Sequence, residues 1–331
     1  MSLRGALLGL GMIGRHHARL LQATPEIEFA GAVDPGGDGF GVVHDPAQVF
    51  ATTAELLAAG PVDFAIVAVP TDEHLAAVTE LAAAGVHVLV EKPLAATTAD
   101  AQQLTAVVRD AGLHGAVGHV ERFNPALIGL RDRVQRGDLG RPFLIATERL
   151  GPFPDRVKDV GVVKDLATHD LDLVRWLGGS PVARVAAETA HKAGRDHEDL
   201  VLATGRLAND TAFNCVVDWL TPTKVRRTRV LGEAGMLVAD TLSADLTFYA
   251  NGQVRGSWPA DEQFRGVSEG DMTRFALARR EPLLVELETF CALLGGDTSA
   301  PVVTLEEGVE IVACAEAVLA SAADGRTVDL T

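Results

Sequence analysis

The feature that most constrains the fold is a glycine-spaced segment near the amino terminus. Gly9, Gly11 and Gly14 lie between an apolar run predicted as a strand, Ala6 to Leu10, and a helical pattern from Ile13 to Gln22. In a dinucleotide-binding unit the first glycine permits a tight turn, the second lets a pyrophosphate approach the main chain, and the third lets helix and strand pack closely. Because the chain has 33 glycines, the spacing gains its weight from this strand-turn-helix context.

Asp34 ends the next predicted strand, twenty residues after Gly14. A carboxylate there accepts hydrogen bonds from the adenosine ribose and repels a 2′-phosphate, which favours NAD over NADP. The alternative is a turn aspartate before Pro35. We predict an NAD site that includes the three glycines, Met12 and Ile13 between them, and Asp34.

The remainder of the first 120 residues alternates short apolar strands with helical stretches. Such alternation indicates βαβ units and a doubly wound parallel sheet of five or six strands, so residues 1–120 are predicted to form an α/β Rossmann domain. The predicted strands are 64–69, 86–90 and 115–117, and the helices are 53–59, 72–84 and 98–111.

From residue 121 to 331 the pattern becomes β-rich. Strands without intervening helices predict an α+β domain with a large, open, mostly antiparallel sheet. One face of such a sheet is left without helices, and we expect it to form the interface of a homodimer or homotetramer. The predicted strands are 143–150, 182–190, 200–207, 211–219, 225–231 and 246–249, and the helices are 125–136, 165–177, 283–294 and 305–323.

Charge and cysteine content exclude several classes of function. Acidic residues outnumber basic ones by 45 to 29, which disfavours nucleic acids and anionic membranes as partners and suits a cationic substrate. The three cysteines have no metal-ligand spacing, so no metal is expected.

No apolar run has the length of a membrane span, and the opening segment lacks a signal-peptide cleavage pattern. A cytoplasmic location is predicted.

Three residues are candidates for chemistry. Lys92 follows a strand at the carboxyl edge of the sheet, where open α/β sheets bind ligands. Asp165 and His169 are four residues apart in a predicted helix and therefore share one face, and histidine takes a proton near neutral pH. The alternatives are a solvated lysine, a helix N-cap with a surface partner, or a metal pair that lacks a nearby third ligand.

Five segments together resemble the Gfo/Idh/MocA family of sugar and inositol dehydrogenases, over essentially the whole chain: GLGMIGRHHARL, VAVPTDEH, VLVEKPLA, GHVERFNPAL and DLATHDLDLVRWLGG. The resemblance implies that His169 is the general base, that Lys92 hydrogen-bonds the reacting oxygen, and that Asp165 holds a substrate hydroxyl and positions His169. It also implies a cis peptide before Pro93.

The same resemblance implies further contacts, each with packing or capping as the alternative. For the cofactor they are Pro70, Thr71, His74, Glu91 and Lys92. For the substrate they are His119, Arg122 and Asn124, beside Lys92, Asp165 and His169.

Two further segments, GPFPDRVKDVGVVKDLATHDLDL and DWLTPTKVRRTRVLGEAGM, resemble the branch of UDP-N-acetylglucosamine 3-dehydrogenases, which implies oxidation at C3. Lys224 and Arg226, followed by Arg227 and Arg229, either meet a diphosphate or form an exposed strand of alternating charge. Lys164 stands where the branch leads us to expect an apolar residue, and it either contacts substrate or faces solvent.

We therefore predict an NAD-dependent dehydrogenase that oxidises a secondary ring hydroxyl of a sugar. The substrate is a nucleotide-linked amino sugar or an amino-sugar glycoside of the kind found in aminoglycoside biosynthesis. The nearest alternative is an inositol or cyclitol dehydrogenase. A non-enzymatic NAD-binding regulator is opposed by the intact Lys92, Asp165 and His169, and an NADPH-dependent aldose reductase by Asp34.

Overall fold

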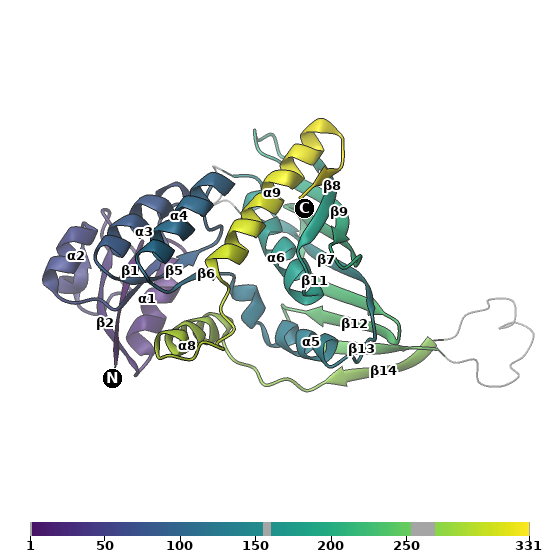
Figure 1. Ribbon diagram of the computed structural model, residues 1–331, viewed down its shortest axis with the longest axis horizontal. Coiled ribbons are helices and arrows are strands. Elements are labelled where there is room, and N and C mark those ends of the chain that lie inside the picture. The colour runs from purple at the N-terminus through teal and green to yellow at the C-terminus, as the bar shows by residue number, and fades with distance from the viewer. Residues whose placement is uncertain (1, 155–159, 253–268, 331) are drawn as a thin grey trace, which may run out of the picture. The chain divides into compact units, whose positions relative to one another are not determined.

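The computed structural model describes residues 2–154, 160–252 and 269–330. Five residues of the segment GPFPDRVKDVGVVKDLATHDLDL, 155–159, lie outside this description. The chain forms two compact units (Figure 1). The first comprises Met1–Val120 and Leu283–Glu316, and the second comprises Glu121–Pro282 and Ala317–Thr331.

The first unit contains a six-stranded parallel sheet in the order β3-β2-β1-β4-β5-β6. The order reverses between β1 and β4, and such sheets usually bind their cofactor at the carboxyl ends of the two strands at this point. The prediction of a Rossmann domain is confirmed. The strands are β1 (Leu3–Leu8), β2 (Ile27–Val33), β3 (Val49–Phe50), β4 (Phe64–Val67), β5 (His87–Glu91) and β6 (Gly115–Gly118).

Helices cover both faces of this sheet because its strands are apolar on both sides. Within β4, Ala65 and Val67 pack under one set of helices, whereas Phe64 and Ile66 pack under the other. The first set is α2 (Thr53–Ala59), α3 (His74–Ala83), α4 (Thr98–Asp110) and the start of α9 (Leu305–Asp324); the second is α1 (Gly14–Ala23) and α8 (Pro282–Leu294).

The place of α8 differs from the domain boundaries expected from the sequence, which assigned all of 121–331 to a second domain. Leu283, Leu287 and Phe290 form one apolar stripe on α8 and are buried in the core of the first unit. The Phe290 ring meets that of Phe64 edge-on, with centroids 5.9 Å apart. Periodicity along the chain reveals such a stripe, but it carries no information about which sheet the stripe covers.

The second unit contains a nine-stranded sheet in the order β14-β13-β12-β11-β7-β10-β9-β8-β15. Every neighbouring pair is antiparallel except β7 and β10. The prediction of a large, mostly antiparallel sheet is confirmed. The strands are β7 (Pro142–Pro152), β8 (Val182–Ala190), β9 (Leu200–Leu207), β10 (Ala212–Asp218), β11 (Leu220–Gly232), β12 (Gly235–Asp240), β13 (Asp245–Asn251), β14 (Glu269–Phe275) and β15 (Val328–Asp329).

Two helices of this unit, α5 (Pro125–Gln135) and α6 (Thr168–Gly178), pack on the sheet. The prediction that one α-helix begins at Asp165 is wrong, because a π-helical turn, η4 (Val163–Ala167), precedes α6. At the end of this π-helical turn the amide of Thr168 donates to the carbonyl of Val163, five residues earlier. The Glu198 carboxylate accepts from the Val163 amide at 3.0 Å, so a residue remote in sequence caps the start of this turn.

The opposite face of the nine-stranded sheet carries large apolar side chains that are open to solvent. They are Leu202, Leu231, Tyr249 and Met272, with exposed fractions of 38 to 64%. Met272 lies directly across from Tyr249 in the pairing of β14 with β13. These four side chains are referred to as the open apolar face.

Within the described ranges, none of the helices combines the length and the apolar character needed to cross a bilayer.

Candidate functional site

The glycine segment lies between β1 and α1, and each glycine has its own structural reason. A Cβ on Gly9, whose φ is +93°, would lie 2.5 Å from the carbonyl oxygen of Ala68. A Cβ on Gly14 would lie 2.0 Å from the carbonyl oxygen of Gly9. A Cβ on Gly11 would meet no atom within 4 Å, its chain neighbours aside. The first and third glycines are therefore required by close backbone packing, and the second borders open space, as the predicted approach of a pyrophosphate requires.

The start of α1 suits an anion for a further reason. Its first turn carries no acidic side chain, so the partial positive charge of its free amides is not neutralised from within the helix. Met12 and Ile13, beside these amides, are 46% and 38% exposed although both are large and apolar. This exposure is consistent with the predicted role of both residues in the cofactor site.

Asp34 follows β2, and main-chain amides on both sides hold its carboxylate. Oδ2 accepts from the amide of Leu10 at 2.8 Å, and Oδ1 accepts from the amide of Gly36 at 2.8 Å. The turn role of Asp34 is thus observed, and it does not oppose the predicted cofactor role. Because each carboxylate oxygen can accept a second hydrogen bond, Asp34 can still receive the two ribose hydroxyls of NAD.

Of the residues expected after β4, Pro70 is exposed, Thr71 is half-buried and His74 is buried. Each ring nitrogen of His74 lies 3.1 Å from a main-chain carbonyl oxygen, one of Val69 and one of Leu94. Burial lowers the pKa of His74. His74 thus connects the segments that follow β4 and β5. This is the packing role that was the alternative to a cofactor contact.

Glu91 ends β5 and precedes Lys92, and the peptide between Lys92 and Pro93 is cis, as expected. Glu91 Oε1 lies 2.6 Å from Nε2 of His17 on α1, and Oε2 accepts from the Lys92 amide at 3.2 Å. Burial raises the pKa of Glu91, but the hydrogen bond and charge of His17 and the charge of Lys92 outweigh burial and hold this pKa below its usual value. Glu91 is an ionised link between α1 and the main chain of Lys92.

In the second unit, Lys164 and Asp165 lie on the π-helical turn η4, and His169 lies in the first turn of α6. All three are half-buried. The amide of Asp165 donates to the carbonyl of Gly161 at 3.2 Å. The structure therefore places the two predicted residues Asp165 and His169 on consecutive turns, the first of them wider than an α-helical turn.

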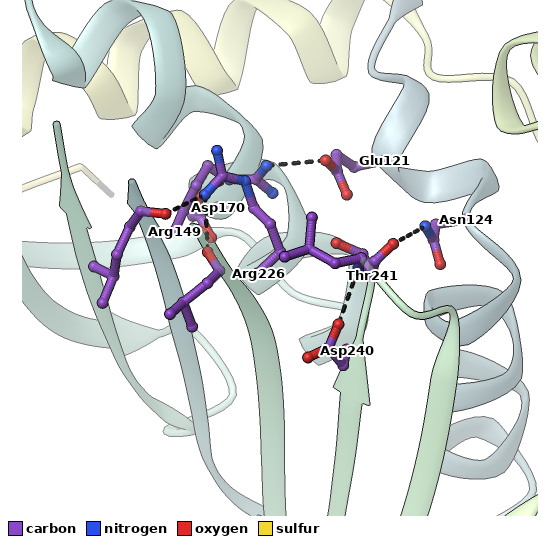
Figure 2. A network of polar contacts seen from close by, with 10 residues as sticks. Glu121, Asn124, Arg149, Asp170, Arg226, Asp240 and Thr241 are labelled. Atoms are coloured by element: carbon purple, nitrogen blue, oxygen red, sulfur yellow. Dashed lines mark hydrogen bonds and ion pairs between the residues drawn. The ribbon is translucent and has the colours of Figure 1, made fainter. Parts of the chain in front are cut away.

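Arg149 on β7 is central to a buried polar network (Figure 2). Its Nε donates to Asp170 at 2.6 Å, and its Nη1 donates to Glu121 at 2.9 Å. Burial lowers the pKa of Arg149, but the charges and hydrogen bonds of Asp170 and Glu121 outweigh burial and raise it. Because Asp170 directly follows His169, this network anchors the helix that carries His169.

A second ion pair anchors the same helix. Arg122 Nε donates to both carboxylate oxygens of Asp172, at 2.9 and 3.1 Å, and both side chains are buried. Asn124 caps α5 by accepting from the Ala126 amide at 3.0 Å, and it donates to the Thr241 carbonyl at 3.2 Å. Packing and capping are thus the observed roles of Arg122 and Asn124, and His119 is almost fully buried.

The basic residues of β11 divide between the two faces of the sheet. Arg227 and Arg229 lie 3.8 and 3.4 Å from the carboxylate of Glu148. Lys224 is exposed. The four cations therefore do not form a single patch, as strand alternation leads us to expect.

Arg226 belongs to the face that carries the buried network, and it is half-buried (Figure 2). It donates to the carbonyls of Leu150 at 2.7 Å and Val225 at 2.8 Å. Burial and the charge of Arg149 lower the pKa of Arg226, while nearby carboxylates including Asp165 oppose this.

The sequence reasoning missed several ionisable residues around the predicted ones. Asp170 and Asp172 alternate with Leu171 and Leu173, and a buried carboxylate requires a partner, so this pattern is a signal for an ion pair. The identity of the partner is not encoded locally. The residues missed are His17, Glu121, Arg149, Asp170, Asp172 and Glu286.

Among the described residues, no three His, Cys, Asp or Glu side chains are grouped in a way that would hold a metal ion.

Comparison with known proteins connects both units to one group of enzymes. The profile of the oxidoreductase family GFO_IDH_MocA, with an NAD-binding Rossmann fold, matches residues 3–119. The profile of the GFO/IDH/MocA C-terminal domain matches residues 128–238.

Among curated relatives, UDP-N-acetylglucosamine 3-dehydrogenase of Acidithiobacillus ferrooxidans is 31% identical over 87% of both chains. Its solved structure, GnnA, matches with a TM-score of 0.84 at 28% identity over 97% of both chains. Myo-inositol dehydrogenase Hyg17 of Streptomyces leeuwenhoekii is 30% identical over 97% of both chains. The solved structure of GenD2 from gentamicin A biosynthesis, in complex with NAD, matches with a TM-score of 0.79 at 25% identity over 100% of this chain and 97% of that one.

Proposed function

The chain belongs to the Gfo/Idh/MocA family of NAD-dependent oxidoreductases, and from this premise we propose that it oxidises a secondary ring hydroxyl, at C3, of an amino sugar. The observation that carries the proposal is the similarity to a UDP-N-acetylglucosamine 3-dehydrogenase over 87% of both chains. The amino sugar is either nucleotide-linked or part of a glycoside of the aminoglycoside type, the second supported by the similarity to GenD2.

Bound NAD supplies the acceptor for the hydride that leaves the carbinol carbon. His169 accepts the hydroxyl proton on an imidazole nitrogen as the carbon–oxygen double bond forms. Lys92 donates a hydrogen bond to the same oxygen and stabilises its developing negative charge. Asp165 accepts a hydrogen bond from a neighbouring hydroxyl and so orients the ring.

The anchoring of α6 supports the role proposed for His169. A general base is efficient only when it is held within hydrogen-bonding reach of the proton it removes. Asp170 and Asp172, one and three residues after His169, each form a buried ion pair with an arginine. These pairs hold the first turns of the helix and therefore limit the motion of the imidazole.

Charged side chains of the second unit are proposed as substrate contacts beyond the reacting carbon. Arg226 is suited to a diphosphate because a guanidinium donates to two phosphate oxygens at once, and its half-buried position strengthens such a contact. Lys164, next to Asp165, is proposed to contact the sugar, and exposed Lys224 to contact the more distal part of the substrate.

A panel of alcohols tests the proposed function, with NADH formation followed by absorbance. We expect NAD-dependent oxidation of UDP-N-acetylglucosamine or of an amino-sugar glycoside with a free 3-hydroxyl. Activity on nucleotide sugars alone would support the diphosphate contact of Arg226. Activity on free inositols alone would favour the alternative function, a cyclitol dehydrogenase, which the similarity to Hyg17 supports.

The catalytic assignment is tested by Lys92→Ala and His169→Ala. Each is expected to lower turnover by about two to four orders of magnitude, the usual contribution of a positioned acid–base group, while NAD binding persists. The matched controls are Lys192→Ala and His191→Ala, whose side chains are exposed. Turnover at the wild-type rate in either active-site variant would remove that residue from the mechanism.

The open apolar face is proposed as the surface through which the subunits form a homodimer or homotetramer. Four large apolar side chains gathered on one sheet face are unusual for a monomer. Light scattering is expected to give a multiple of the 34.8 kDa chain mass, and Met272→Asp is expected to lower it. A wild-type mass of one chain would refute the proposal.

A further inference from the structure

A cluster of buried ionisable groups, Glu286, His17 and Glu91, lies in the first unit, and Glu91 directly precedes Lys92. Glu286 on α8 is 2% exposed, and His17 on α1 is 1% exposed. Neither carboxyl oxygen of Glu286, nor Nδ1 of His17, has a hydrogen-bond partner among the described residues. Buried polar atoms without partners are rare in folded proteins, so the cluster requires a physical explanation.

The two carboxyl groups of the cluster, Glu286 and Glu91, differ in charge. Burial, and then the negative charge of Glu91, raise the pKa of Glu286 well above its usual value, so Glu286 is a neutral acid. Glu91 is ionised, because His17 and Lys92 outweigh its burial and lower its pKa. Of the two carboxyl groups, Glu91 therefore carries the negative charge, and it accepts from the Lys92 amide.

A contact on each carboxylate oxygen fixes the orientation of the Glu91 side chain. Its Oε1 is 2.6 Å from His17 Nε2, and its Oε2 accepts from the Lys92 amide at 3.2 Å. Gly118 on β6 pairs directly with Glu91, and a Cβ at Gly118 would lie 3.2 Å from Glu91 Cδ. The absence of a side chain at position 118 provides the room that the carboxylate occupies.

We propose that His17 is a positioning residue for Lys92: it orients the Glu91 carboxylate, which in turn fixes the main chain from which the Lys92 side chain extends. The inference rests on the proposed function, in which Lys92 hydrogen-bonds the reacting oxygen. His17 acts through Glu91 and Lys92 rather than on the substrate itself.

Titratable groups from several elements face Glu91. They are His17 on α1, His74 on α3, Lys92 after β5 and Glu286 on α8, whereas β6 contributes only Gly118 at this point. Among them His17 supplies the side-chain hydrogen bond to Glu91. When His17 is removed, burial raises the pKa of Glu91, and the protonated carboxyl no longer holds the Lys92 amide as an anion does.

The kinetic test compares His17→Ala with His16→Ala, a matched control because His16 is exposed on the same helix. Misplacement of a catalytic group by about 1 Å costs on the order of 100-fold in rate, so kcat of His17→Ala is expected to fall by roughly 10- to 100-fold while KM for NAD is unchanged. In His17→Gln the side-chain amide can donate to Glu91, and part of kcat is expected to return. His16→Ala is expected to keep the wild-type kcat.

The pH profile separates positioning from a general loss of structure. In His17→Ala the acid limb of kcat/KM is expected to move to higher pH, because Glu91 then protonates at higher pH. A wild-type kcat and acid limb in His17→Ala would overturn the inference. If that variant does not fold, Gly118→Ala provides the second test, since it crowds the Glu91 carboxylate while leaving His17 in place, and unchanged kcat there overturns the inference equally.

Hydrogen exchange supplies a readout that needs no substrate. The Lys92 amide is expected to exchange faster in His17→Ala than in wild type or His16→Ala, because its acceptor is no longer held. If the wild-type protein oxidises none of the alcohols in the panel, the proposed function fails and exchange still decides whether His17 fixes Lys92. If the wild-type protein is active and exchange at Lys92 is the same in all three proteins, the positioning role alone fails.

Discussion

Each unit buries charged groups beside a residue proposed for catalysis, but the two units satisfy those groups differently. In the second unit Arg149 and Arg122 form ion pairs at hydrogen-bonding distance with Asp170 and Asp172. In the first unit Glu91 is paired with His17, whereas Glu286 is buried without a hydrogen-bond partner among the described residues. Burial raises the pKa of both Asp170 and Glu286, but in the second unit the charge of Arg149 opposes this rise, whereas in the first unit the negative charge of Glu91 adds to it.

The difference matters for stability. Loss of one member of a buried pair leaves the other member charged and unsolvated, whereas loss of an unpartnered acid removes a group that was costly to bury. Replacing one buried charged or acidic residue by an apolar one is therefore expected to lower the free energy of unfolding in the second unit and to raise it in the first. Three measurements of the free energy of unfolding test this contrast.

The largest effect is expected from Arg122→Met, which leaves Asp172 buried without its arginine. Breaking a buried ion pair typically costs about 3–5 kcal/mol, so the free energy of unfolding should fall by this amount in urea titrations. Arg206→Met is the matched control, because its ion pair with Asp210 is exposed and such pairs contribute at most about 1 kcal/mol. Equal effects of the two substitutions would contradict the role assigned to burial.

A smaller effect of opposite sign is expected from Glu286→Leu. The folded-state pKa of Glu286 is raised, so the folded protein keeps a proton that the unfolded chain releases, and wild-type stability falls as pH rises from the unfolded pKa towards the folded pKa. Removing a buried polar group without a partner is expected to stabilise by about 1–3 kcal/mol. The gain should be larger at pH 8 than at pH 5.

Urea titrations at both pH values measure this effect, with Glu80→Leu as the control because Glu80 is exposed on α3. If Glu286→Leu stabilises the protein equally at pH 5 and pH 8, Glu286 has a hydrogen-bond partner or is ionised in the folded protein. The contrast between the two units would then disappear.

The smallest effect is expected from Asn124→Ala, which removes a neutral polar contact from the second unit. Loss of an N-cap side chain costs about 1 kcal/mol, and Asn124→Ser should retain most of the stability because a serine oxygen can also accept from the amide of Ala126. If the alanine variant also raises KM for the sugar, Asn124 contacts substrate in addition to capping α5.

Much of the first unit could be predicted because its signals are local. The glycine spacing, the apolar strands and the position of Asp34 are each contained in a short stretch of sequence. β14 was not predicted, because nearly all of its side chains are exposed, among them Asp271 and Arg274, and no apolar alternation marks it. Its strand conformation comes from pairing with β13, which sequence patterns do not encode.

The candidate site shows the same limit. Lys92 and His169 lie on the elements expected for them, after a strand and at the start of a helix. The division of Arg226 from Arg229 could be anticipated from strand alternation, whereas the pairing of Arg229 with Glu148 depends on the register of β11 with β7. The approach of α1 to Glu91 is likewise a property of tertiary packing, and for that reason His17 was missed.

The path of the chain between the units has a consequence for how the protein is made. Residues 283–316 complete the first unit, although the second unit begins at Glu121. During synthesis the first unit therefore cannot complete its core until α8 has left the ribosome. Until then Phe64 and Ile66 lack the cover of Leu287 and Phe290. A fragment ending at Val120 would also lack the cover that α8 provides. Neither unit is formed by one continuous stretch of the chain, so neither can be moved to another protein as a single segment.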